Sequence, residues 1–139
     1  MSRRTRAREV ALQVLFQDDL NPDPINEEAS LNKLGAFLGA RLREEDLRDF
    51  AKGLVLGVKR NQQELDELLE KHAENWTLRR MAATDRNLMR LAAYEIRFTE
   101  TPPNVAIDEA VELAKRFGAK QSSQFVNGIL DKLIERNDE

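Results

Sequence analysis

The stretch 105–133, VAIDEAVELAKRFGAKQSSQFVNGILDKL, predicts two helices joined by a tight elbow, and the rest of the chain supplies their partners. Apolar residues recur in both halves at three- and four-residue spacing, which is the pattern of a single buried helix face. Gly118 follows the first half and predicts a left-handed C-cap, and Ser122 or Ser123 can cap the second helix. The two stripes consist of Ile107, Ala110, Val111, Ala114 and Phe117, and of Phe125, Val126, Ile129, Leu130, Leu133 and Ile134.

Five earlier segments carry the same helical spacing, and two proline-containing breaks, NPDP at 21–24 and TPP at 101–103, interrupt it. No segment alternates in the manner of a strand. The sequence therefore predicts an all-α fold of about seven helices, arranged as two small bundles (about 1–75 and about 76–139) that share one core. The five segments are 4–20, one that starts at Asn26 or Ser30, 44–61, 62–74, and one capped by Thr84 or Asp85 that runs to 98.

The composition is that of one well-packed, water-soluble helical domain of 139 residues, with 34% charged residues of both signs and few Gly and Pro. The absence of Cys fits a reducing cytoplasm and excludes disulfide and thiolate chemistry. There is no apolar run of about 18 residues for a membrane span. The arginines at the start precede no apolar segment, so we expect no signal peptide.

The charge of the chain is segregated. Residues 1–8 contain four arginines and no acid, so the remainder carries −7 although the whole chain carries only −3. Cations at a helix N-terminus cost about 0.3–1 kcal/mol each against the helix dipole. Two interpretations stay open at this point: a frayed, solvated basic start, or an anion-binding head in which phosphate contacts offset the cost. We call these residues the basic head: Arg3, Arg4, Arg6 and Arg8.

The usual signatures of catalysis are missing from the sequence. It contains no Gly-rich phosphate loop and no Ser/His/Asp set, and its single His, with no Cys, excludes the usual zinc patterns. His72 lies on the apolar stripe of its helix and is expected to be a packed residue. Glu95, beside a stripe, is better explained as a carboxylate tied to an Arg or a helix end than as a catalytic acid. The sequence thus favours a binding protein without cofactor or metal.

Three blocks carry more specific information: RRTRAREVALQVLF at the start, Trp76 with TDRNLMRLAAYE in the middle, and PPNVAIDEAVELAKRFGAKQSSQFVNGILD near the end. The last block is the most specific, because a helix ending in AKRFG followed by S-x-x-FVNG-x-LD does not arise from generic helix packing. With these blocks the chain resembles the NusB family of transcription antitermination proteins over essentially its whole length. The resemblance implies an all-helical protein of two antiparallel three-helix-type bundles.

The resemblance also implies a function. Proteins of this family bind boxA-type single-stranded RNA of nascent ribosomal RNA transcripts, together with NusE, a small-subunit ribosomal protein, within the RNA polymerase antitermination complex. It places RNA contacts at the basic head and at the elbow, and NusE contacts at a second set. Thr5 stands where relatives often carry a basic residue, and Phe16 replaces a common Tyr. The elbow set is Lys120, Gln121, Gln124 and Phe125, and the protein-partner set is Phe16, Asp85, Arg86 and Met89.

The physics of the residues is compatible with this assignment. Arginines hold the phosphates of single-stranded RNA while aromatic rings stack on its bases. Phe125 would offer such a ring if exposed, although aromatic burial habits favour a core position. Two other classes compete: a protein-binding scaffold whose basic head meets an acidic partner, and a fragment of an RNA cytosine methyltransferase. The second requires a cofactor domain and cysteines that the 139 residues lack, so we set it aside. Family members occur as monomers and as homodimers, and no residue decides between them.

Overall fold

The computed structural model describes residues 3–22, 27–74 and 76–137, and these form seven α-helices, one short 3-10 helix and no strand. The predicted all-α class and helix number are confirmed. No helix in these ranges is both long enough and apolar enough to span a bilayer. The chain divides into two compact units, 1–60 and 61–139. The boundary lies earlier than the expected one near residue 75, because the helix that follows residue 61 packs against the later helices.

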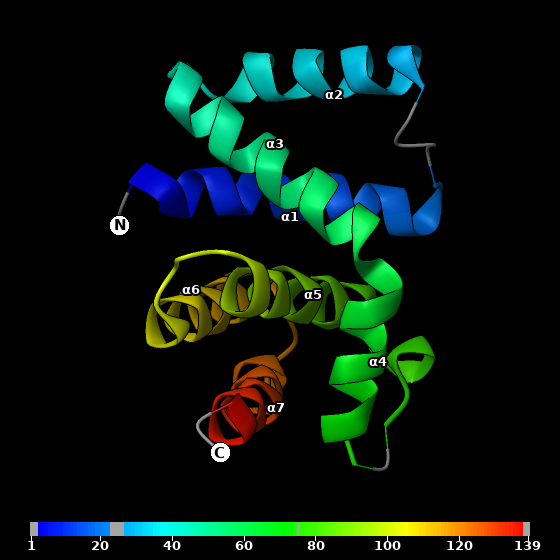
Figure 1. Cartoon of the computed structure of the whole chain (residues 1–139), viewed down its shortest axis with the longest axis vertical. Coiled ribbons are helices and arrows are strands. Elements are labelled where there is room, and N and C mark those ends of the chain that lie inside the picture. Colours follow the sequence, from blue (N-terminus) through cyan, green and yellow to red (C-terminus); the bar gives the residue numbers. More distant parts are fainter. Residues whose placement is uncertain (1–2, 23–26, 75, 138–139) are drawn as a thin grey trace. The chain divides into compact units, whose positions relative to one another are not determined.

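The first unit consists of three helices, in which α3 (Glu45–Arg60) packs against both α1 (Arg3–Leu20) and α2 (Glu28–Arg41) (Figure 1). Helix α1 ends before the expected proline-containing break, of which residues 23–24 lie outside the described ranges. The expected helix start at Asn26 also falls outside them. The buried apolar residues of this unit are Ala7, Val10, Ala11, Leu12, Leu15, Leu34, Leu38, Leu42, Leu47, Ala51, Leu54, Val55 and Val58.

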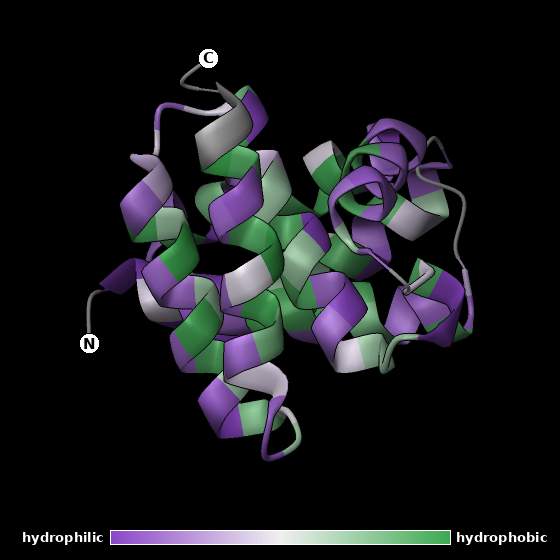
Figure 2. Cartoon of the chain, turned by 90° about the horizontal axis from the view of Figure 1, so that it is seen from below, coloured by the Kyte–Doolittle hydropathy of each residue, from purple (hydrophilic) through white to green (hydrophobic). Residues whose placement is uncertain are grey.

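The second unit is built on the predicted hairpin of α6 (Pro103–Phe117) and α7 (Ser122–Asn137). Helix α5 (Ala83–Phe98) packs on both of them, and α4 (Gln62–His72) packs on α5 and α7. Between α4 and α5 lies the 3-10 helix η1 (Leu78–Arg80). Hydrophobic and hydrophilic residues alternate along the helices, as one apolar face per helix requires (Figure 2).

Two local predictions about helix ends are wrong. Thr84 and Asp85 do not cap α5, because the helix begins at Ala83 and both residues lie in its first turn. Gly118 is not left-handed, since its φ of −89° and ψ of −176° are extended. The glycine is needed for space instead: a Cβ there would lie 2.6 Å from Ser122 Cβ and 2.8 Å from the Ala114 carbonyl oxygen. Ser122 Oγ accepts a hydrogen bond from the Ala119 N–H at 2.8 Å and so closes the elbow.

Candidate functional site

The basic head occupies the first turn and a half of α1, in the first unit. Helix α1 has no acid in its first turn. Acids come instead from the start of α3, where Arg3 forms ion pairs with Glu44 and with Asp46, the latter at 3.1 Å. The Arg3 guanidinium donates hydrogen bonds to both oxygens of Asp46 at 3.2 and 3.1 Å. These bonds lower the pKa of the Asp46 carboxyl, and the Arg3 side chain nevertheless stays 61% exposed.

The other three arginines of the head differ in their surroundings. Arg4 lies over the ring of Phe50, with its guanidinium carbon 4.5 Å from the ring centroid, and Arg8 lies 5.2 Å from the same centroid. Arg6 pairs with Glu9 at 3.2 Å, one helical turn away. Arg3, Arg4 and Arg6 are exposed, whereas Arg8 is only 3% exposed. Three of the four arginines of the head are therefore exposed, and Arg8 is buried.

The elbow set lies in the second unit, at the junction of α6 and α7. Lys120, Gln121 and Gln124 are exposed. Phe125 is half-buried, so it is neither the fully buried core residue that was favoured nor a fully exposed ring. Its N–H donates to the Gln121 carbonyl oxygen at 3.2 Å, which fixes the ring in the first turn of α7.

The expected protein-partner set is divided between the two units. Phe16 belongs to α1 and is 36% exposed, whereas the other three residues belong to α5. Asp85 is 8% exposed, and its Oδ1 has no hydrogen-bond partner among the described residues. The Arg86 guanidinium donates to the Leu78 and Met81 carbonyl oxygens at 3.0 and 3.2 Å. Met89 is 0% exposed.

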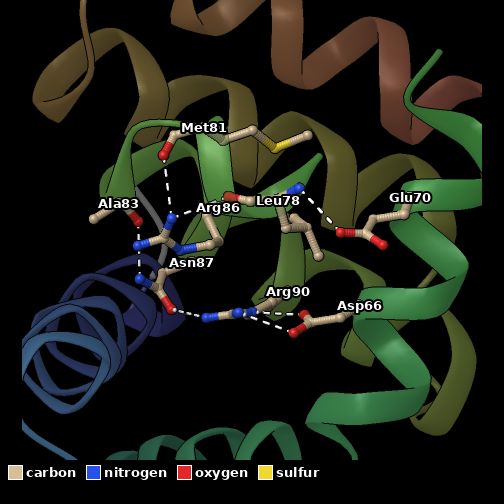
Figure 3. A network of polar contacts seen from close by, with 8 residues as sticks. All are labelled: Asp66, Glu70, Leu78, Met81, Ala83, Arg86, Asn87 and Arg90. Atoms are coloured by element: carbon tan, nitrogen blue, oxygen red, sulfur yellow. Dashed lines mark hydrogen bonds and ion pairs between the residues drawn. The ribbon is translucent and has the colours of Figure 1, made fainter. Parts of the chain in front are cut away.

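A polar network that the sequence did not reveal holds α4 and the η1 segment against α5 (Figure 3). Arg90 is bidentate on Asp66, with Nε–Oδ1 at 2.7 Å and Nη2–Oδ2 at 2.9 Å. Arg90 also donates to Asn87 Oδ1 at 3.2 Å, and Asn87 donates to the Ala83 carbonyl oxygen at 2.8 Å. In the sequence Arg90 and Asp66 have no special signature, because their pairing depends on which helices become neighbours.

Sequence reasoning also missed the exposed connection between α4 and α5. Trp76 is 50% exposed there, and its ring centroid lies 5.7 Å from that of Phe125 in an edge-to-face arrangement. Arg79 and Arg80 of η1 follow it and are exposed. The dipeptide RR three residues after an isolated Trp was the available signal. The described residues contain no group of three or more His, Cys, Asp or Glu side chains able to hold a metal ion.

Comparison with known proteins decides the family. The family model described as NusB family matches residues 5–135, which is nearly the whole chain. This chain is a member of the NusB family. The chain is 46% identical over 134 residues to the transcription antitermination protein NusB of Bacillus subtilis (strain 168), covering 96% of this chain and 95% of that protein. The NusB of Anaeromyxobacter dehalogenans (strain 2CP-1 / ATCC BAA-258) is 44% identical over 132 residues, covering 95% and 90%.

Solved NusB structures share the fold. The T. maritima NusB structure superposes with a TM-score of 0.81 at 35% identity, covering 96% of this chain and 92% of that chain. A crystal structure of the antitermination factors NusB and NusE in complex with dsRNA contains a chain with a TM-score of 0.82 at 27% identity. That match covers 98% of this chain and 99% of the other. The resemblance inferred from the three sequence blocks is confirmed.

Proposed function

We propose that this protein is a transcription antitermination factor. It binds boxA-type single-stranded RNA of nascent ribosomal RNA transcripts together with NusE, and so promotes processive transcription by RNA polymerase. The observation that carries the proposal is the similarity to NusB antitermination proteins along nearly the entire chain. The role is that of a non-enzymatic adaptor in the cytoplasm, where nascent transcripts and ribosomal proteins meet.

The first proposed RNA contact is the exposed part of the basic head, namely Arg3, Arg4 and Arg6. Arg3 and Arg6 are held in surface ion pairs. Such pairs contribute about 0–1 kcal/mol, so an RNA phosphate can replace the carboxylate at little cost. Arg8 is proposed to support the head through the Phe50 ring rather than to touch RNA, since it is buried.

The second proposed contact is the elbow, where Lys120, Gln121 and Gln124 are exposed and Phe125 is half-buried. A lysine and two amides offer a phosphate contact and base-edge hydrogen bonds, and an aromatic ring offers stacking. This combination suits a single strand better than a duplex, whose base faces are covered. The head and the elbow belong to different units, and each is proposed as a contact by itself.

For the protein partner we propose Phe16 and Asp85 as the points of contact. Phe16 exposes a large apolar ring, and Asp85 leaves one carboxylate oxygen without a donor among the described residues. A buried acceptor without a donor is costly, so a donor from NusE would stabilise it. Arg86, which binds the Leu78 and Met81 carbonyl oxygens, and the buried Met89 are proposed to support α5 and the η1 segment rather than to meet NusE themselves.

Salt dependence of RNA binding tests the role of the head. If the three arginines neutralise three phosphates, they should contribute about −2 to the log–log salt slope for a boxA-type RNA. Replacing Arg3, Arg4 and Arg6 by Ala should make the slope shallower by about 2, with helicity by circular dichroism unchanged. A triple variant of Lys52, Arg60 and Arg97 to Ala removes the same number of exposed cations elsewhere and should keep the slope.

Adding NusE to the same titration separates this function from the main alternative. An antitermination factor should bind a boxA-type RNA more tightly than a scrambled RNA, and more tightly still with NusE present. A protein-binding scaffold would bind NusE with no preference for RNA sequence. An unchanged slope in the head variant would move the RNA contact away from α1.

A further inference from the structure

The connection between α4 and α5 exposes a large aromatic surface to which no role has been given. Trp76 is the single tryptophan of the chain and is 50% exposed. It lies in the second unit, beside the half-buried Phe125 of the elbow. The exposed half of the Trp76 indole is available to bind a ligand, and an indole offers a large aromatic face for stacking.

The geometry of the pair leaves aromatic faces unused. The ring planes of Trp76 and Phe125 meet at 73°, with centroids 5.7 Å apart. In such an edge-to-face contact each ring keeps at least one face out of the contact, and a third ring can stack on a face of this kind. Glu74 and Lys132, 3.8 Å apart, tie the same turn to α7 at a second point. The Trp76–Phe125 pair therefore lies at the surface of the second unit and is not part of its buried core.

The backbone that carries Trp76 is firmly held. The Trp76 N–H donates to the Ala73 carbonyl oxygen at 3.0 Å, and the Leu78 N–H donates to Glu70 Oε1 at 3.2 Å. The Arg86 guanidinium binds the Leu78 and Met81 carbonyl oxygens from below, as Figure 3 shows. Leu78 and Met81 are buried. A turn anchored in this way loses little conformational freedom when a ligand binds.

The charges around the pair select an anionic partner. Arg79 and Arg80 are exposed within one turn of Trp76, and Lys120 is exposed in the elbow that precedes Phe125. Of the acids in this part of the chain, Glu74 pairs with Lys132, and Glu70 accepts a hydrogen bond from the Leu78 N–H. Aromatic rings combined with cations are what a single-stranded nucleic acid requires, because bases stack on the rings while the cations hold the phosphates.

We propose that Trp76, in edge-to-face contact with Phe125, is a stacking platform for one base of single-stranded RNA. Arg79 and Arg80 hold the phosphates next to that base. The proposal rests on the proposed function and adds Trp76, Arg79 and Arg80, which lie outside both the basic head and the elbow set. A polypeptide partner on the same rings would be a different function.

Intrinsic fluorescence tests the proposal directly, because Trp76 is the single tryptophan of the chain and can be excited selectively over Tyr94. Titration of a boxA-type RNA into the full chain should quench Trp76 emission in parallel with binding measured by an independent label on the RNA. Trp76→Leu keeps an apolar side chain but removes the π-face and should weaken binding by about tenfold or more, while Trp76→Phe should retain most of the affinity. Arg79→Ala with Arg80→Ala should make the salt slope shallower by about 1.4.

A matched control lies on another exposed ring of the same unit. Phe98 is 43% exposed and stacks on Tyr94 with centroids 5.6 Å apart. Phe98→Leu should leave RNA affinity unchanged, and thermal melting of every variant checks that the fold is retained. RNA binding with unchanged emission and full affinity of Trp76→Leu would overturn the platform while leaving the proposed function intact. Quenching by NusE alone would assign Trp76 to a protein interface, and no RNA binding by the unaltered chain would refute both proposals.

Discussion

The arginines of the basic head show why residue type alone does not define a binding surface. Four arginines in six positions predict one cationic cluster, and the prediction is correct for charge. The surroundings of each arginine depend on α3. The Phe50 ring of α3 contacts Arg4 and Arg8, and Asp46 in its first turn pairs with Arg3. The sequence contains α3 and its stripe, but it does not contain the register of α3 against α1.

At Arg3 the competition between internal carboxylate and RNA phosphate is measurable. The hydrogen bond from Arg3 lowers the pKa of Asp46, so this contact stabilises the folded state above the ordinary carboxyl pKa and is lost as the pH falls through the lowered value. Arg3→Ala should raise the Asp46 pKa toward its ordinary value. Saturating boxA-type RNA should do the same, because Arg3 then turns to a phosphate. Carboxyl NMR titration measures both shifts, and a pKa unaffected by RNA would exclude Arg3 from the contact.

Arg6 and Arg8 form a matched pair for separating binding from stability. Arg8→Met should lower the free energy of unfolding by about 1–2 kcal/mol, since the contact of the buried guanidinium with the Phe50 ring is lost. Its salt slope for RNA should stay the same. Arg6→Met should change stability by less than about 0.5 kcal/mol, because its ion pair with Glu9 is half exposed. Its slope should become shallower by about 0.7. Denaturant unfolding and RNA titration distinguish the two, and the reverse assignment would place Arg8 on the binding surface.

At the scale of elements, the spacing of apolar residues was sufficient to predict all seven helices, because each has one face that must be buried. Helix ends were predicted less well. Gly118 was expected for its conformational freedom, but the structure uses it for the absence of a Cβ beside Ser122. A left-handed backbone and a lack of space for a Cβ both require glycine, and only the packing of α6 on α7 shows which of the two applies at Gly118. The Arg90–Asp66 pair between α5 and α4 was likewise invisible in the sequence.

Two glycines of the hairpin should respond to Ala with opposite signs. Gly118→Ala places a Cβ 2.6 Å from Ser122 and should destabilise the protein by about 1–3 kcal/mol as the elbow shifts. Gly128, within α7, has no heavy atom within 4 Å of an added Cβ. Gly128→Ala should therefore stabilise the protein by about 0.5–1 kcal/mol through helix propensity. Urea unfolding of both variants gives the comparison, and equal effects would contradict the close approach at Gly118.

For the molecule as a whole, the decisive feature is an acidic body that carries a small cationic region. The segregation was read directly from the sequence, since residues 1–8 are positive and the remainder is negative. The family assignment also came from the sequence blocks alone. The contact between Trp76 and Phe125 could not be predicted from the sequence. The two residues lie 49 positions apart and meet only when the α4–α5 connection packs on α7.

An acidic body should improve selectivity by repelling RNA that does not fit the contacts. Glu64, Glu100 and Asp108 are exposed acids of the second unit, and changing all three to the amides removes three negative charges. At about 0.02 M salt the affinity for a scrambled RNA should rise about twofold to fivefold, whereas that for a boxA-type RNA should rise less. Above about 0.2 M salt the screening length is short and the difference should vanish. The measurement is the affinity ratio of the two RNAs against salt. A ratio that is independent of these charges at low salt would mean that selectivity resides entirely in the direct contacts.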